Sequence, residues 1–126
     1  MDVPLNNTLS KEERLYCRKD IDSLLAAGRF VSGGPIRFCY RTPNGAGMCR
    51  ILVSVPKKNF KHAVKRNLLK RRIREAYRLQ KHVLDDIEAD ILFVYTSKEI
   101  LSSEEIRVLV GNFLTSLKER CTPHEA

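Results

Sequence analysis

The chain has 126 residues, of which 23 are Lys or Arg and 15 are Asp or Glu, which gives a formal net charge of +8. This length predicts a single domain, residues 1–126, that buries about 65% of its unfolded surface, with flexible arms at residues 1–9 and 121–126. No signal-peptide pattern opens the sequence and no apolar run reaches the length of a membrane span, so we expect a cytoplasmic protein with no membrane partner. The cysteines lack the spacing of a metal site and are expected as reduced thiols: Cys17, Cys39, Cys49 and Cys121.

The first part of the chain predicts helix. Residues 10–13 have the form of a capping box, which indicates at least one helical turn. A longer helix is predicted to begin at Asp20 as its N-cap, to run through Ile21 and Leu25, and to end at Gly28.

Two strands are predicted next. The first, Ile36–Arg41, alternates so that Phe38 and Tyr40 share one face. The second covers residues 50–55, and the Pro, Asn and Gly residues at 43–47 predict a turn, so the two strands are expected to form a hairpin. Phe38 is expected in the core. For Tyr40 the sequence leaves two interpretations open: a core aromatic, or an aromatic beside a positive groove that stacks an unpaired base.

A basic segment dominates the middle of the chain. Residues 61–81 hold nine Lys or Arg and one acidic residue, so they carry the whole net charge of +8. They contain no Gly or Pro and predict a helix of about five turns. The side expected to pack on the core carries Val64, Leu68, Leu69, Ile73, Ala76 and Leu79, with Tyr77 at its border. The opposite arc, about 140° wide, carries Arg66, Asn67, Lys70, Arg71, Arg74, Arg78 and Lys81.

This cationic arc is either a solvated helix face or a surface for a polyanion. A solvated face usually mixes both signs, whereas Arg66, Lys70 and Arg74 are like-charge neighbours four residues apart, and each such pair costs about 0.2–0.5 kcal/mol. Several of these cations also lie in the first turns, where the helix dipole disfavours them. Phosphates along the face would remove both costs, so the pattern favours nucleic-acid binding.

The rest of the chain predicts a strand, a helix and no catalytic group. A cluster of carboxylates precedes a nearly continuous apolar run at residues 91–95, which predicts a central strand. A second capping box at 102–105 opens a final helix with an apolar side that includes Ile106 and Phe113. A nuclease site on the protein would need carboxylates placed around Mg²⁺. Their spacing favours a polar turn instead, so we expect neither catalytic nor metal-binding residues among Asp85, Asp86, Glu88 and Asp90.

The stretch from Val53 to Glu75 resembles the signature of the bacterial ribonuclease P protein subunit. In that family a strand ends in S-x-K-K and a short loop leads to a helix with A-V-x-R-N-R-x-K-R-x-x-R-E. Here Leu68 stands at the second Arg of R-N-R, and the loop at residues 59–62 is one residue longer. The first helix is similar to the family's R-L-x(4)-D-F-x-x-V-F-x-x-G, with Ile21 and Leu25 at the two Phe positions.

The resemblance implies an α/β class fold, an α+β two-layer sandwich. Its order is helix, strand, strand, helix, strand, helix around a small mixed sheet, with a left-handed crossover through the basic helix. It also implies an endoribonuclease subunit that helps a catalytic RNA subunit to remove the 5′ leader of precursor tRNA. Mg²⁺ would be bound mainly by the RNA and none tightly by the protein, and no obligate protein partner is expected.

The resemblance and the charge pattern together define two candidate surfaces. The RNA-binding residues are expected to be Lys57, Lys58, Lys61, Lys65, Arg66, Asn67, Lys70, Arg71, Arg74 and Arg78. The resemblance implies a cleft for the substrate leader at Tyr40, Phe38, Ile21 and Leu25, although the sequence alone favours a core position for Ile21 and Leu25.

Two other functions fit a basic helix. A structural or ribosomal RNA-binding protein would need the helix but no leader cleft. A DNA-binding regulator would place the helix in a major groove, but a strand and a lysine-containing loop precede it instead of a helix-turn-helix spacing.

Overall fold

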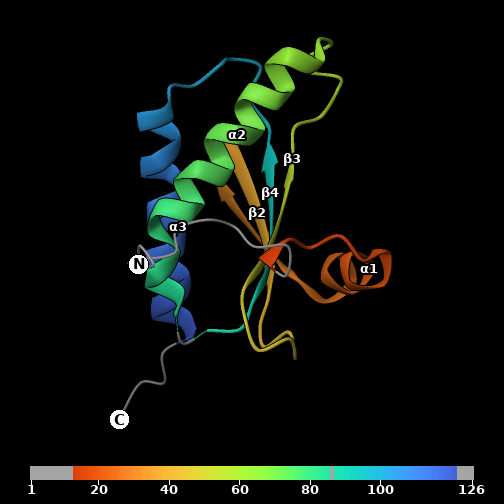
Figure 1. The fold of residues 1–126 in the computed structure, drawn as a ribbon, viewed down its shortest axis with the longest axis vertical. Helices are drawn as coiled ribbons and strands as arrows, with labels where there is room; N and C mark the ends of the chain where they lie inside the picture. The colour runs from red at the N-terminus through yellow and green to blue at the C-terminus, as the bar shows by residue number, and fades with distance from the viewer. Residues whose placement is uncertain (1–12, 86, 122–126) are drawn as a thin grey trace, which may run out of the picture.

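The computed structural model describes residues 13–85 and 87–121, so the predicted arm at 1–9 and most of the first capping box lie outside the described residues. Of the predicted arm at 121–126 only Cys121 is described, and it is helical instead of part of a flexible arm. Figure 1 shows a four-stranded sheet between helices, with α1 on one side and α2 and α3 on the other. In chain order the elements are α1 (Arg18–Ala27), β1 (Arg29–Gly33), β2 (Ile36–Arg41), β3 (Arg50–Ser54), α2 (Ala63–Gln80), the short 3-10 helix η2 (Lys81–Leu84), β4 (Asp90–Tyr95) and α3 (Ser103–Cys121). In this part of the chain no helix is long and apolar enough to cross a bilayer.

The sheet has the order β1-β2-β4-β3, which corrects the predicted hairpin. β2 and β3 are not neighbours, because β4 lies between them, antiparallel to β2 and parallel to β3. The apolar β4 is buried along most of its length and takes a central place with a partner on each side. The segment between β2 and β3 is therefore a connection across the end of β4 and not a tight turn.

The hairpin in this sheet is formed by β1, a strand that the sequence analysis did not predict. β1 and β2 pair antiparallel from Arg29 opposite Tyr40 to Gly33 opposite Ile36. The turn between them contains Gly34 at φ +76°, in the left-handed region that favours glycine.

The connection from β3 through α2 to β4 is left-handed, as the resemblance implied. In Figure 1 β3 and β4 both point upward, α2 passes in front of the sheet, and β4 lies to the left of β3. Crossovers between parallel strands are right-handed in about 98% of cases, so this handedness is a specific feature of the fold.

The main core lies between the sheet and the two long helices. β2, β3 and β4 turn alternate side chains toward α2 and α3, including Phe38 and Phe93. α3 contributes Phe113, whose ring stacks on that of Phe38 with centroids 4.1 Å apart. α2 contributes Leu69, Ile73, Ala76 and Tyr77.

The opposite face of the sheet carries a smaller core under α1. There Leu24 is buried against Leu15, Cys39 and Leu92, with Ile21 partly buried beside them. Helices therefore cover both faces, although α1 covers only part of its face.

The ends of α1 differ partly from the prediction. The helix begins after Cys17, and Asp20 lies in its first turn instead of capping it. Asp20 accepts a hydrogen bond from Arg50 at 3.1 Å, so its carboxylate serves a tertiary contact. The helix ends at Gly28 as predicted, where a Cβ atom would lie 2.4 Å from the Leu24 carbonyl oxygen.

Candidate nucleic-acid interface

α2 buries one side and exposes most of the predicted basic side. Tyr77, predicted at the border, is 1% exposed. Val64 and Leu79, predicted to face the core, are instead 80% and 42% exposed. Val64 lies in the first turn of α2, which in Figure 1 extends beyond the tips of β3 and β4, so no strand is available to cover it.

Some basic residues of α2 form hydrogen bonds or ion pairs within the chain, and others do not. Arg66 donates hydrogen bonds to the carbonyl oxygens of Phe60 at 2.7 Å and Lys61 at 2.9 Å. Arg72 donates to the carbonyl oxygen of Leu101, at the entrance to α3. Both guanidinium groups therefore hold loops in place.

Two further cations near the end of α2 are paired with carboxylates. Arg78 forms an ion pair with Glu75, and this hydrogen bond holds the pKa of Glu75 below its ordinary value. Lys81, just past α2, pairs with Glu13 at 2.9 Å. This pairing leaves less positive charge at this end of the helix than the sequence alone indicates.

The remaining cations on α2 have no partner among the residues that the structure describes. Lys65, Arg71 and Arg74 are exposed and Lys70 is partly exposed. Asn67 is exposed beside them. Asn67, Lys70, Arg71 and Arg74 lie within one arc of about 100° and form what we call the free α2 face, which has three positive charges and no described counter-charge. Lys65 lies on the other side of the helix, in its first turn.

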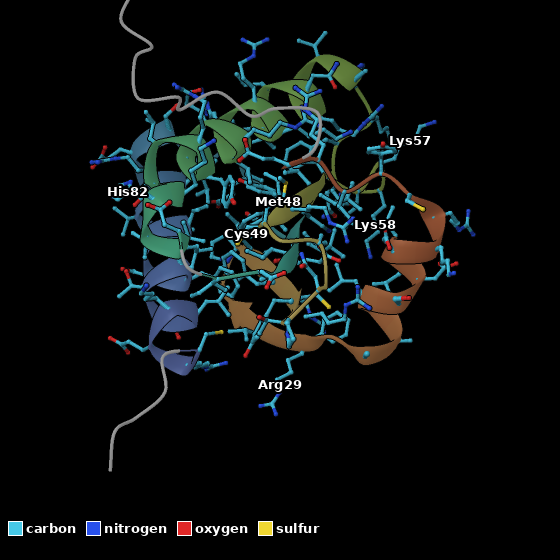
Figure 2. All side chains as sticks on the ribbon, turned by 60° about the horizontal axis from the view of Figure 1, so that its bottom comes forward. Arg29, Met48, Cys49, Lys57, Lys58 and His82 are labelled. Atoms are coloured by element: carbon cyan, nitrogen blue, oxygen red, sulfur yellow. The ribbon has the colours of Figure 1, made fainter. Side chains whose placement is uncertain are left out.

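A lysine-containing loop joins β3 to the start of α2. Lys57 and Lys58 are exposed in its turn, and Figure 2 places them across the molecule from His82, which follows α2. Phe60 anchors the loop, because its ring is buried 5.8 Å from the ring of Tyr95. Lys61, next to Phe60, is exposed and adds a third lysine to the loop.

The four residues predicted to line a leader cleft do not come together. Phe38 and Tyr40 point into the main core, where they are 2% and 5% exposed. Ile21 belongs to the smaller core on the other face of the sheet, and Leu25 is 47% exposed on α1. The alternation of β2 puts Phe38 and Tyr40 against α3, which is why they cannot share a cleft with α1.

An exposed aromatic on the α1 face was missed by the sequence analysis. Phe30 of β1 is 49% exposed and lies opposite Cys39, which faces α1. The guanidinium carbon of Arg37 lies 4.8 Å from the centre of the Phe30 ring, a cation–π contact. Because β1 was not recognised as a strand, the alternation that exposes Phe30 could not be used.

Asp90 is a structural carboxylate. It is fully buried and accepts hydrogen bonds from Arg50 Nε at 2.8 Å, Arg50 Nη2 at 2.9 Å and Arg41 Nη2 at 3.2 Å. Arg50 also bonds to Asp20, so this network ties α1 to the sheet. The hydrogen bond to Asp90 raises the pKa of Arg50, which keeps the guanidinium charged.

The other predicted carboxylates are dispersed. Glu88 accepts a hydrogen bond from the Gly47 amide at 2.7 Å, Asp85 is exposed, and Asp86 lies outside the described residues. No group of His, Cys, Asp or Glu side chains within residues 13–85 and 87–121 is placed to hold a metal ion.

Comparisons with known proteins identify the family. The family model described as "Ribonuclease P" matches residues 9–118. A relative from Porphyromonas gingivalis, named ribonuclease P protein component, is 44% identical over 108 residues, which is 79% of each chain. Another from Borrelia duttonii, with the same name, is 34% identical and covers 82% of this chain and 90% of its own.

Solved structures of ribonuclease P proteins have the same fold. That from Staphylococcus aureus aligns with a TM-score of 0.73 at 22% identity, covering 84% of this chain and 95% of its own. That from Thermotoga maritima aligns with a TM-score of 0.72 at 27% identity, covering 82% and 96%. With the family match over most of its length, this chain belongs to the family of bacterial ribonuclease P protein subunits.

Proposed function

We propose that this chain, a subunit of the endoribonuclease ribonuclease P, binds the catalytic RNA subunit through the free α2 face and the loop before it. The observation that carries the proposal is the set of three cations on the free α2 face that have no described partner. Like charges on one helix repel each other, and RNA phosphates would convert this cost into charge-assisted hydrogen bonds. Lys57, Lys58 and Lys61 extend the same surface beyond the start of α2.

Arg66 and Arg78 have different roles in this proposal from those expected of the motif. Arg66 supports the interface by holding the carbonyl groups of Phe60 and Lys61, which fixes the loop. Arg78 contributes less charge because Glu75 already pairs with it.

We place the 5′ leader of precursor tRNA on the sheet face beside α1. The support is the exposed Phe30 ring with Arg37 against it, an aromatic and a cation on an incompletely covered face. Stacking of an unpaired base on an aromatic side chain contributes about 1–3 kcal/mol. Substrate bound there would be held beside the RNA subunit, and the cleavage would take place in the cytoplasm, where bacteria make precursor tRNA.

The described carboxylates of the cluster before β4 do not fit a Mg²⁺ site. Both oxygens of Asp90 are occupied by arginines, and Glu88 accepts a backbone amide. We therefore propose that the RNA binds the Mg²⁺ that cleavage requires. The chain contributes cations that reduce repulsion between two folded RNAs and help to position the substrate.

Reconstitution of precursor-tRNA cleavage tests this function. A bacterial ribonuclease P RNA should cleave faster at low Mg²⁺ when the chain is present, and the two rates should converge at high Mg²⁺. The chain should also bind precursor tRNA more tightly than mature tRNA, which a ribosomal RNA-binding protein would not do. Cleavage by the chain without any RNA subunit would contradict the proposal.

A further inference from the structure

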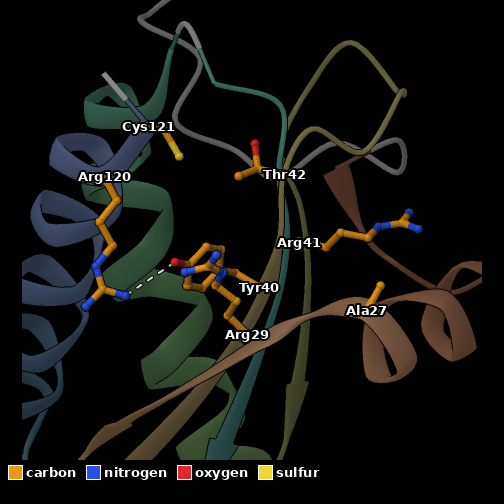
Figure 3. A pocket seen from close by; sticks show the side chains of 7 residues that line it. All are labelled: Ala27, Arg29, Tyr40, Arg41, Thr42, Arg120 and Cys121. Atoms are coloured by element: carbon orange, nitrogen blue, oxygen red, sulfur yellow. Dashed lines mark hydrogen bonds between the residues drawn. The ribbon is translucent and has the colours of Figure 1, made fainter. Parts of the chain in front are cut away.

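A cavity of about 510 Å³ opens at the end of the sheet where β1 begins and β2 ends. Three arginines line it, Arg29, Arg41 and Arg120, and no acidic side chain of the described residues does. Figure 3 shows Arg29 and Arg120 converging on the hydroxyl end of Tyr40, while Arg41 points to the other side of the sheet. The volume is within the range of about 300–1,000 Å³ that small-molecule sites occupy.

The topology explains how the two converging arginines meet. Arg29 and Tyr40 are paired in the β1–β2 register, so their side chains lie on the same face of the sheet. Arg120 comes from the last turn of α3 and donates a hydrogen bond from Nη1 to the Tyr40 hydroxyl at 3.3 Å. Its other guanidinium donors have no described partner.

Interactions within the folded chain explain only part of this cluster of arginines. The dipole of α3 favours a cation at its C-terminal end, which accounts for Arg120. It does not account for Arg29, which is exposed and has no ion pair among the described residues. Arg41 is bound to Asp90, so it adds a largely neutralised charge.

The chemistry of the cavity favours a phosphate group. The guanidinium fork matches phosphate oxygens in a bidentate manner, and two forks can converge on one phosphate. Tyr40 is only 5% exposed, so its ring offers no face on which a base could stack. Recognition would therefore be of backbone charge and not of base identity.

The cavity is separate from the lysine-containing loop that precedes α2. β3 ends at Ser54 and leads to Lys57 and Lys58, whereas Tyr40 and Arg29 lie at the opposite end of the sheet, beside the start of β4. In Figure 2 Arg29 lies at the lower edge of the molecule, away from Lys57 and Lys58.

We infer that Arg29 and Arg120 bind a phosphodiester group of an RNA strand, as a second point of contact beyond the free α2 face. The inference rests on the proposed function, because the RNA would be either the RNA subunit or precursor tRNA. Two contacts at opposite ends of the sheet would fix the orientation of the protein on RNA, which one charged helix cannot do alone.

The test uses the full chain with Arg29→Gln and Arg120→Gln, singly and together. Loss of one charge-assisted phosphate contact should lower the affinity of the double variant for one of the two RNAs about tenfold. The slope of log affinity against log salt should fall by about 0.7 for a single strand or 0.9 for a double strand. Separate titrations with the RNA subunit, precursor tRNA and mature tRNA identify which RNA supplies the phosphate.

Arg107→Gln is the matched control. It removes an exposed arginine of the same helix, α3. Arg107 is paired with Glu104 and lies near the opposite end of α3 from Arg120. This variant should keep the parental affinity and salt slope. Titration with inorganic phosphate, followed by NMR at the arginine side chains, should shift the Arg29 and Arg120 signals in the parent chain.

The outcomes separate this inference from the proposed function. If the double variant binds all three RNAs like Arg107→Gln while the parent still assists cleavage, the cavity inference is wrong and the function stands. If phosphate shifts the two signals but RNA affinity and salt slope are unchanged, the cavity binds a small anion only and the inference is overturned. Displacement of phosphate by an acidic peptide but not by RNA would overturn it in favour of a protein partner.

Discussion

The two faces of the sheet have different surroundings. On the α2 and α3 side, the aromatic rings of Phe38, Phe93 and Phe113 are in mutual contact and buried. On the α1 side, only a small core lies under the helix, and Phe30 and Leu25 are about half exposed.

This difference assigns the stability of the fold to one face and leaves the other face for a ligand. Side chains on the face covered by α2 and α3, which we call the closed face, cannot be made smaller without opening a cavity in a close-packed interior. Side chains on the face beside α1, the open face, have no such constraint. The same residue type should therefore respond differently to substitution on the two faces.

Phe38→Ala should have the largest effect, because it removes a ring from the closed face. We expect a loss of about 3–5 kcal/mol in the free energy of unfolding, from lost burial and the remaining cavity. Chemical denaturation followed by circular dichroism measures this loss. A change of stability as small as that of a surface substitution would show that the closed face is not the main core.

Asp90→Asn should also be strongly destabilising, although it changes little volume. The substitution removes the charge that compensates Arg50 and Arg41, and breaking a partly buried pair costs about 3–5 kcal/mol. It should also loosen α1, which the Arg50–Asp20 bond holds. Glu88→Gln is the control, and it should change stability by less than about 0.5 kcal/mol because Glu88 is exposed.

Stability should fall at alkaline pH through Cys49, at the edge of the main core. Burial raises the pKa of this thiol from 9.0 to about 11. A thiol that holds its proton more tightly in the folded chain contributes stability below pH 9, and this contribution is lost as the pH rises to about 11. The loss should be about 2 kcal/mol, measured as the difference between the parent and Cys49→Ala in denaturation curves across this range.

Phe30→Ala should affect binding and not folding. We expect less than about 1 kcal/mol of lost stability, because the ring is half exposed. Loss of a stacked base should weaken binding of precursor tRNA by about 1–3 kcal/mol. Affinity for mature tRNA, which lacks the leader, should not change, and an equal loss for both RNAs would contradict the placement of the leader on this face.

The elements that could be predicted from the sequence are those with strong local patterns. The basic helix, the apolar β4 and the capped α3 were all found from composition and periodicity. The left-handed crossover came from the family resemblance and from no local property. β1 was missed because its five residues carry Gly and Ser and have a weak alternation.

The pairing of strands and the roles of single cations depend on contacts distant in sequence. β4 separates β2 from β3, and no local pattern of the connecting segment reveals this. Arg66 looks equivalent to Lys70 and Arg74 in sequence, yet it binds backbone carbonyls and the other two do not. The residues predicted for the leader cleft do not lie on one surface, because Phe38 and Tyr40 face α3 and Ile21 lies on the other face of the sheet.

The most direct test of the central claim is the Mg²⁺ dependence of reconstituted cleavage with Lys70, Arg71 and Arg74 all changed to Gln. These side chains bind no described part of the chain, so the variant should unfold at the parental temperature. If the free α2 face binds RNA, the variant should need more Mg²⁺ to reach the parental rate and should match that rate when Mg²⁺ is saturating, because bulk cations replace the missing charges. An unchanged Mg²⁺ requirement would show that this face is only a solvated surface.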